Sequence, residues 1–147
     1  MNNIDIKIMS RMDAMEYTYI AKEPTIIISI SEHGTPNILI DETNTNVKDI
    51  LNLKFSNVLH TISKYNAMTK EQALEVKNFI NKYKNKEIKT IVVHCCDGHS
   101  RSAAVASAIL KYLKGNDEQI LHNKQYLLNK HCYNLCLEAF GLNNIAS

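Results

Sequence analysis

The chain has 147 residues, of which 45% are hydrophobic and 22% charged, and this fits one domain with a single core over residues 1–147. Its formal net charge of +2 gives no broad electrostatic basis for binding nucleic acid or a membrane surface. The start of the chain lacks a signal-peptide pattern, and no apolar run approaches the ~20 residues that cross a bilayer, so we expect a cytoplasmic protein.

The N-terminal half predicts three strands and one helix. Residues 4–9 alternate like a short strand, and Ser10 then starts a helix over 11–19 with a capping-box pattern. The β-branched run at 25–30 has no polar alternation, which indicates a strand buried on both faces. A loop and a turn of polar residues, glycine and proline follow, and residues 48–55 are predicted as the third strand.

The C-terminal half predicts one more strand between helices. Thr69 opens a second capping-box pattern, and apolar residues keep helical spacing as far as Tyr83. A strand over 88–93 and a helix over 100–114 follow, and Gly115 is expected to end that helix. Two further helical pieces are predicted, at residues 117–123 and 129–140.

The order of these elements predicts an α/β fold. Apolar strands that alternate with helices indicate a central, mostly parallel sheet of four to five strands, flanked by helices on both faces. Ligands bind to such sheets beyond the carboxyl ends of the strands, beside helix N-termini. Cys95 follows the strand over 88–93 and is therefore predicted to lie at that place.

The segment HCCDGHSRS, from His94 to Ser102, joins this strand to the next helix. Gly98 allows a backbone conformation that other residues adopt only at a cost. The N–H groups of such a loop and of the first helical turn bind anions, and the helix dipole adds to this. The planar fork of Arg101 suits two oxygens of a phosphate, and the same field stabilises a thiolate at Cys95. The loop therefore supplies a receptor for a phosphate dianion together with a nucleophile.

His94-Cys95, five intervening residues and Arg101-Ser102 resemble the signature of the cysteine-based protein tyrosine phosphatases, and of their small dual-specificity branch in particular. The resemblance implies a phosphomonoester hydrolase without metal or cofactor, in which Cys95 becomes a phosphocysteine. It implies that Arg101 stabilises the transition state, that Ser102 helps the thiolate leave, and that His94 orders the loop and supports a low thiol pKa. The residues expected to surround the phosphate are Cys96, Asp97, Gly98, His99, Ser100 and Arg101.

The pattern departs from the family at the general acid. The family carries an aspartate upstream of the signature, but residues 55–68 contain no carboxylate, and Asn57 stands near the expected position. Asp97 resembles an aspartate in the loop of the myotubularin lipid phosphatases and is our candidate acid, and His60 is a second candidate. A carboxylate from a distant segment is the remaining possibility, with Asp13 and Glu32 as examples.

Three interpretations of function stay open. The first is a protein tyrosine or dual-specificity phosphatase that acts as a monomer on a phosphorylated protein or a small phosphomonoester, with phosphoinositides as a less favoured substrate. The second is a phosphate-binding module of the same fold with poor turnover, which the missing acid supports. The third is a rhodanese-like sulfur transferase, against which the His-Cys start and the Ser-Arg-Ser end of the loop argue.

The cysteines do not suggest a zinc site. The chain has no C-x-x-C pair, and His94 and Cys95, as neighbours on a strand, face opposite ways. We expect a structural or a redox-protective role for the Cys96 thiol, and helix packing for Cys132 and Cys136.

Overall fold

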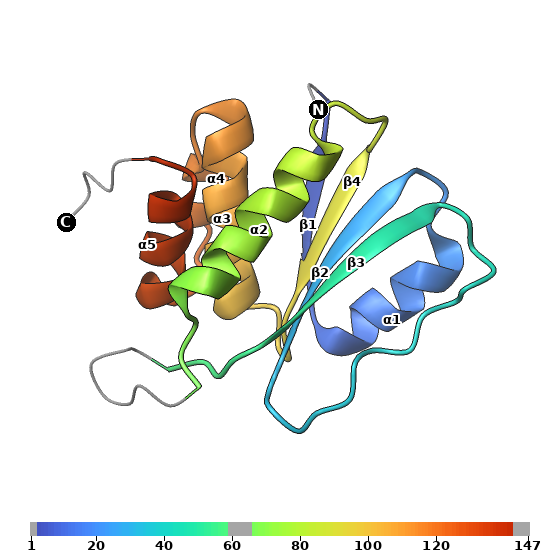
Figure 1. Ribbon diagram of the computed structural model, residues 1–147, viewed down its shortest axis with the longest axis horizontal. Coiled ribbons are helices and arrows are strands. Elements are labelled where there is room, and N and C mark those ends of the chain that lie inside the picture. Colours follow the sequence, from blue (N-terminus) through green and yellow to red (C-terminus); the bar gives the residue numbers. More distant parts are fainter. Residues whose placement is uncertain (1–2, 59–65, 143–147) are drawn as a thin grey trace.

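The structure is a computed structural model that describes residues 3–58 and 66–142. Within these residues the sheet has four strands, all parallel, in the order β1-β4-β2-β3 (Figure 1). The strands are β1 (Asp5–Met9), β2 (Thr25–Ser31), β3 (Val47–Lys54) and β4 (Thr90–His94). The predicted α/β sheet is confirmed, and each strand lies within two residues of the range expected from the sequence.

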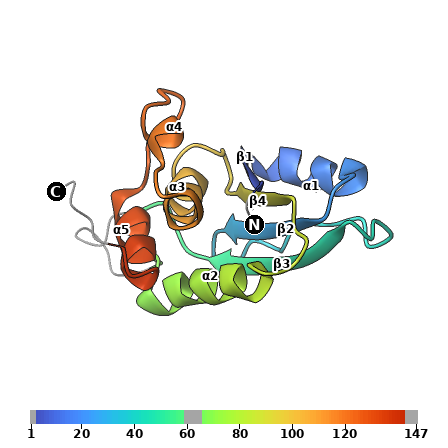
Figure 2. The same ribbon diagram turned by 90° about the horizontal axis from the view of Figure 1, so that it is seen from above.

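Helices cover both faces of the sheet. One face carries α1 (Arg11–Ile20), and Figure 2 shows the larger group on the opposite face. That group consists of α2 (Lys70–Tyr83), α3 (Arg101–Lys114), α4 (Glu118–Leu121) and α5 (Lys130–Ala139). No helix in the described parts of the chain is long and apolar enough to span a membrane.

The apolar run of β2 is buried on both faces, as predicted. Ile26 and Ile28 join the core beneath α2, α3 and α5, whereas Ile27 joins a smaller core with Ala14 of α1. Successive strand side chains point to opposite faces, so a strand between two helical layers needs apolar residues at every position. This arrangement explains the missing polar alternation.

Local signals fix the helix ends. The capping box of α2 has both of its hydrogen bonds, between Thr69 and Gln72, and Gly115 ends α3 with a left-handed φ of 88°. The expected helix over 117–123 is shorter, because only Glu118–Leu121 is helical. The Asp117 carboxylate accepts hydrogen bonds from Ser107 and Tyr133 at 2.7 and 2.6 Å and so is not used to cap the helix.

The carboxyl ends of the strands meet at one edge of the sheet. In the register of the central strands, His94 lies beside Met9 of β1 and beside Ser29 of β2. The residues that follow each strand therefore come together at this edge, as expected for a parallel sheet with a ligand site.

Candidate active site

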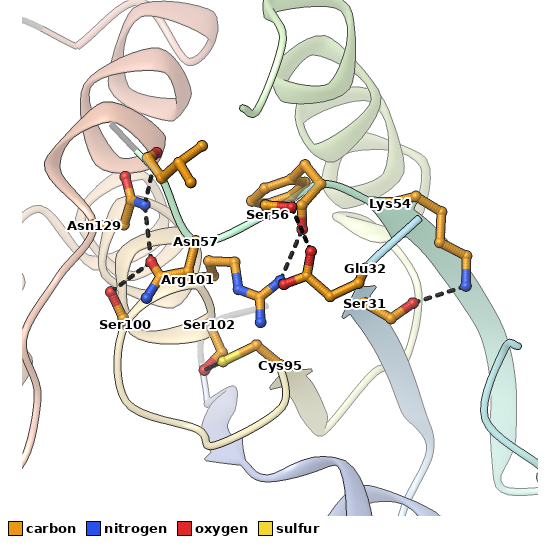
Figure 3. Close-up of polar contacts among 12 residues, drawn as sticks. Ser31, Glu32, Lys54, Ser56, Asn57, Cys95, Ser100, Arg101, Ser102 and Asn129 are labelled. Carbon is orange, nitrogen blue, oxygen red and sulfur yellow. Dashed lines mark hydrogen bonds and ion pairs between the residues drawn. The ribbon is translucent and has the colours of Figure 1, made fainter. Parts of the chain in front are cut away.

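The nucleophile predicted from the sequence is buried in the loop after β4. Cys95 is 3% exposed, and its Sγ lies 3.1 Å from the hydroxyl of Ser102 (Figure 3). Burial by itself raises the pKa of this thiol, but hydrogen bonds from Ser102 and from the Gly98 N–H, with the charge of Arg101, hold the pKa below its ordinary value. The loop therefore favours the thiolate, which is the reactive form of cysteine.

Glycine is required at position 98 because the loop after β4 packs closely against the residues between β1 and α1. Its φ is +77°, and an added Cβ would lie 2.8 Å from the backbone carbonyl carbon of Met9 and 2.9 Å from the Ser10 nitrogen. The neighbouring Cys96 carbonyl accepts a hydrogen bond from the Arg11 N–H at 3.2 Å. The loop backbone thus packs directly on the junction between β1 and α1, and any side chain at position 98 would displace it.

His94 holds the start of the loop as a neutral group. Its Nε2 lies 2.6 Å from the Ser29 hydroxyl and its Nδ1 lies 3.3 Å from the Cys95 carbonyl oxygen. Because a carbonyl only accepts, we assign the proton to Nδ1, with Ser29 donating to Nε2. Burial lowers the pKa of His94 to about 4, and the charges of Arg11 and Arg101 act in the same direction. At neutral pH, His94 therefore orders the loop through hydrogen bonds and adds no positive charge.

Arg101 is fixed from one side by residues that follow β2 and β3. Its Nη1 donates to the Phe55 carbonyl at 2.7 Å and pairs with Glu32 Oε1 at 3.2 Å (Figure 3). The other carboxylate oxygen of Glu32 accepts a hydrogen bond from Ser56. Among the described residues, Nε and Nη2 of Arg101 have no partner, so these two donors are available to an oxyanion.

Sequence reasoning named Glu32 only as an example of a distant carboxylate. The structure brings it to Arg101, although it lies 69 positions away in the sequence. The available signal was its place directly after β2, which neighbours β4 in the sheet. Both of its oxygens accept from Arg101 or Ser56, which suits an ionised carboxylate that positions the arginine.

Asn57 supports the loop through its amide oxygen. This oxygen accepts from Ser100 Oγ at 3.1 Å and from Asn129 Nδ2 at 2.9 Å. Asn129 also donates to the Val58 carbonyl and caps α5 by accepting from the Cys132 N–H. The sequence placed Asn129 at the start of a helix but gave no sign that it connects that helix to Asn57 and to the loop after β4.

The structure places only some of the remaining candidate acids near the loop after β4. Asp97 lies exposed on the loop, and His60 lies outside the residues that the structure describes. The N–H of Asp13 bonds to Ser10 at the start of α1, and within the described residues no hydrogen bond or ion pair joins the Asp13 carboxylate to the loop. Asp97 and Glu32 are thus the carboxylates that the structure places at or beside the loop.

The pKa values of the other thiols are shifted in the opposite direction to that of Cys95. Burial raises the pKa of Cys96, and the charge of Asp97 raises it further. Cys132 and Cys136 are buried in the core, which confirms their predicted packing role, and burial raises the pKa of Cys132 to about 12. Within residues 3–58 and 66–142, no group of three or more His, Cys, Asp or Glu side chains is placed to hold a metal ion.

Comparison with known proteins gives matches in structure but not in sequence. No protein-family model and no curated protein matches the chain. Human DUSP28 matches with a TM-score of 0.65 at 13% identity, over 92% of this chain and 91% of its own. The human tyrosine phosphatase-like serine/threonine/tyrosine-interacting protein matches at 0.64 and 18% identity, over 90% and 89%.

A third solved structure, Tk-PTP in its active form, matches with a TM-score of 0.61 at 18% identity, over 95% of this chain and 92% of that one. All three matches extend over nearly the full length of both chains. The resemblance drawn from the signature residues is therefore confirmed at the level of the fold: the chain folds as the small cysteine-based protein tyrosine phosphatases do.

Proposed function

We propose that the protein hydrolyses phosphomonoesters through a phosphocysteine at Cys95, as a phosphatase of the tyrosine or dual-specificity type. The observation that carries this proposal is the hydrogen bonding of the Cys95 thiol by Ser102 and the Gly98 N–H, beside an arginine that Glu32 and Phe55 fix in place. A low-pKa thiol and a fixed guanidinium supply the attack on phosphorus and the stabilisation of its charge.

The reaction proceeds in two displacements. The Cys95 thiolate attacks phosphorus, the bond from phosphorus to the ester oxygen breaks, and the leaving oxygen takes the electron pair. Water then attacks the phosphocysteine and loses a proton to solvent, the sulfur–phosphorus bond breaks, and inorganic phosphate is released. The Ser102 hydroxyl hydrogen-bonds to the departing thiolate. Arg101 binds the equatorial oxygens in both steps through the donors that face away from Glu32.

The leaving group receives weaker help than the nucleophile. Asn57 cannot donate a proton at neutral pH, and its oxygen is already bonded to Ser100 and Asn129. The exposed Asp97 is our proposed, partial acid. Loss of general acid catalysis costs about 10²–10⁴ in rate, so aryl phosphates, whose leaving groups need little protonation, are the expected substrates.

The position of Asn57 also favours a second candidate function, a module that binds phosphorylated partners and turns over poorly. The interacting protein among the structural matches bears a name that describes it as phosphatase-like. In this case the loop would bind phosphate and the reaction would stop before the ester bond breaks.

Turnover of para-nitrophenyl phosphate separates the two candidates. The wild-type protein should release para-nitrophenol, and Cys95→Ser should abolish release while still binding inorganic phosphate. Cys96→Ser is the matched control, because it removes the adjacent thiol and keeps the nucleophile. A phosphocysteine trapped by acid quench should map to Cys95 by mass spectrometry.

Each contrary result has a separate meaning. Substantial release by Cys95→Ser would show that Cys95 is not the nucleophile. Phosphate binding without any turnover by the wild-type protein would favour the binding module.

A further inference from the structure

Arg11 lies beside the loop after β4, and one nitrogen of its guanidinium donates no hydrogen bond within the described residues. Its backbone N–H bonds to the Cys96 carbonyl at 3.2 Å, and its Nη2 donates to the Pro36 carbonyl at 2.7 Å. Its Nη1 is buried and, among residues 3–58 and 66–142, has no hydrogen-bond partner. Leaving a buried charged donor unpaired is unfavourable, and the described part of the chain supplies no acceptor for this atom.

Arg11 also lines a small cavity. It has a volume of about 70 Å³, and its lining includes Arg11, Glu32, Thr35, Cys96 and Arg101. A single water molecule needs about 10–15 Å³ of such space, so the cavity has room for several waters or for a tetrahedral oxyanion. Arg101 also lines it, so the cavity lies beside the arginine that is proposed to bind the transferred phosphate.

The surroundings of the cavity carry excess positive charge. Lys54 donates to Ser31 Oγ at 2.7 Å and to the Thr35 carbonyl at 2.6 Å (Figure 3 shows the bond to Ser31). Burial lowers the pKa of Lys54, and the nearby charge of Arg11 lowers it further. Within the described residues, neither Arg11 nor Lys54 forms an ion pair, and Glu32 is paired with Arg101.

We propose that this cavity, the Arg11 cavity, binds a second phosphate of the substrate, beside the phosphate that Cys95 attacks. The inference rests on the proposed function and narrows its substrate class to small phosphomonoesters that carry two phosphates close together. Arg11 offers the second group a charge-assisted hydrogen bond from Nη1, and Lys54 adds electrostatic attraction.

The occupant is a small molecule, because Arg11 and Arg101 line the same small cavity and the two phosphates that they bind must lie close together. Residues i and i+2 of an extended peptide, which point to the same side, are about 7 Å apart along the strand. A second phosphorylated side chain of a peptide would therefore extend beyond a space of this size. Two phosphates on one ring or one short chain come closer to each other.

The kinetic test compares phenyl phosphate with 1,3-phenylene bisphosphate. The bisphosphate has two equivalent esters, so a factor of two in kcat/KM is expected without any second site. The wild-type protein should exceed this factor by roughly tenfold, the contribution of one charge-assisted hydrogen bond. Arg11→Gln should return the ratio to about two.

Two further variants keep the test interpretable. Lys22→Gln removes one exposed charge before β2, at the opposite edge of the sheet, and should keep the wild-type ratio. Arg11→Lys keeps the charge but loses the planar guanidinium, so it should give an intermediate ratio. This variant keeps the test possible if thermal denaturation shows that Arg11→Gln does not fold. Equal ratios in the wild-type protein and both Arg11 variants would overturn the proposal.

A binding test separates failure of the cavity from failure of the proposed function. In the Cys95→Ser background, titration calorimetry should show that Arg11→Gln weakens pyrophosphate about tenfold more than inorganic phosphate. If this difference appears while the wild-type protein hydrolyses no ester, the proposal for the Arg11 cavity is supported and the proposed catalytic function is wrong. If esters are hydrolysed and the difference is absent, the cavity assignment fails.

A peptide arm tests the other source of a second anion. A phosphotyrosine peptide with an adjacent glutamate is compared with its glutamine counterpart. If Arg11→Gln removes a preference between these peptides and leaves the bisphosphate ratio unchanged, a peptide and not a small bisphosphate occupies the cavity.

Discussion

The loop after β4 and the segment after β3 lie against each other at the carboxyl edge of the sheet, yet the proposed reaction gives them different roles. The first holds Cys95 and Arg101, with hydrogen bonds that lower the thiol pKa. The second contributes the Phe55 carbonyl and the Asn57 amide, which position the first loop and donate no proton. In the proposed reaction, the loop after β4 therefore carries the reacting groups, and the segment after β3 positions them without acting as an acid.

After Cys95→Ser, Arg101→Lys is the largest change that we predict for the attacking side. Lysine keeps the charge but cannot bridge Glu32 and two phosphoryl oxygens at once, so kcat on para-nitrophenyl phosphate should fall by about 10²–10³. The melting temperature and the affinity for phosphate should be measured alongside, to separate a catalytic loss from a folding loss. Near-normal kcat in a folded Arg101→Lys protein would show that the arginine does not contact the transferred group.

Asn57→Asp should have the next largest effect, confined to the leaving-group side. An aspartate can keep the bonds from Ser100 and Asn129 on one oxygen and carry a proton on the other. We expect kcat on alkyl phosphates to rise about 10²-fold, and much less on aryl phosphates. Asn52→Asp places the same charge on the exposed part of β3 and should change neither. An equal rise on both ester classes would contradict this division of roles.

The neutral His94 should make stability depend on pH. Its folded pKa of about 4 lies below the ordinary 6.5, so the unfolded chain binds a proton that the folded protein does not. The contribution is fully present above pH 6.5 and is lost as the pH falls toward 4, by about 3 kcal/mol in total.

Urea unfolding at several pH values checks this expectation. His94→Gln should flatten the pH dependence relative to the wild-type protein, whereas His33→Gln, on an exposed loop, should not. Carboxylates titrate in all three proteins, so only the difference between the curves reports on His94. Parallel curves for the wild-type protein and His94→Gln would refute the neutral assignment.

Ser102→Ala should produce the smallest change. It removes one hydrogen bond to the Cys95 sulfur and keeps the one from the Ser102 backbone, so alkylation by iodoacetamide at pH 6 should slow by roughly tenfold. A Cys96→Ser background isolates the signal on one peptide, and buried Cys136 provides an internal unreactive reference. Unchanged alkylation would mean that the backbone donors alone set the thiol pKa.

The elements of the fold could be predicted because their signals are local. The β-branched run at 25–30, the capping box at Thr69 and the glycine at 115 each act within a few residues, and the structure confirms all three. The helix predicted over 117–123 begins within one residue of the expected start but ends at Leu121, so its predicted C-terminal end was wrong.

In the candidate site too, residues close together in the sequence were predictable, and residues from distant segments were not. The groups around Cys95 belong to one continuous segment, so their spacing alone suggested their proximity. Glu32 and Asn129 reach that segment through strand order and helix packing, and a single sequence does not specify these distances. Arg11 was missed for a similar reason, because its relation to Cys96 depends on β1 lying beside β4.

The bond between Asn129 and Asn57 has a consequence for the order in which the site is completed. Chains are synthesised from the N-terminus, so Cys95 and Arg101 leave the ribosome before Asn129. Until α5 docks, the segment after β3 lacks its tie to that helix, and the carbonyl of Ser100 lacks the N–H of Asn129. A nascent or prematurely terminated chain would thus contain the proposed nucleophile within an unsupported loop. If the loop binds phosphate as proposed, full binding would show that translation had passed α5.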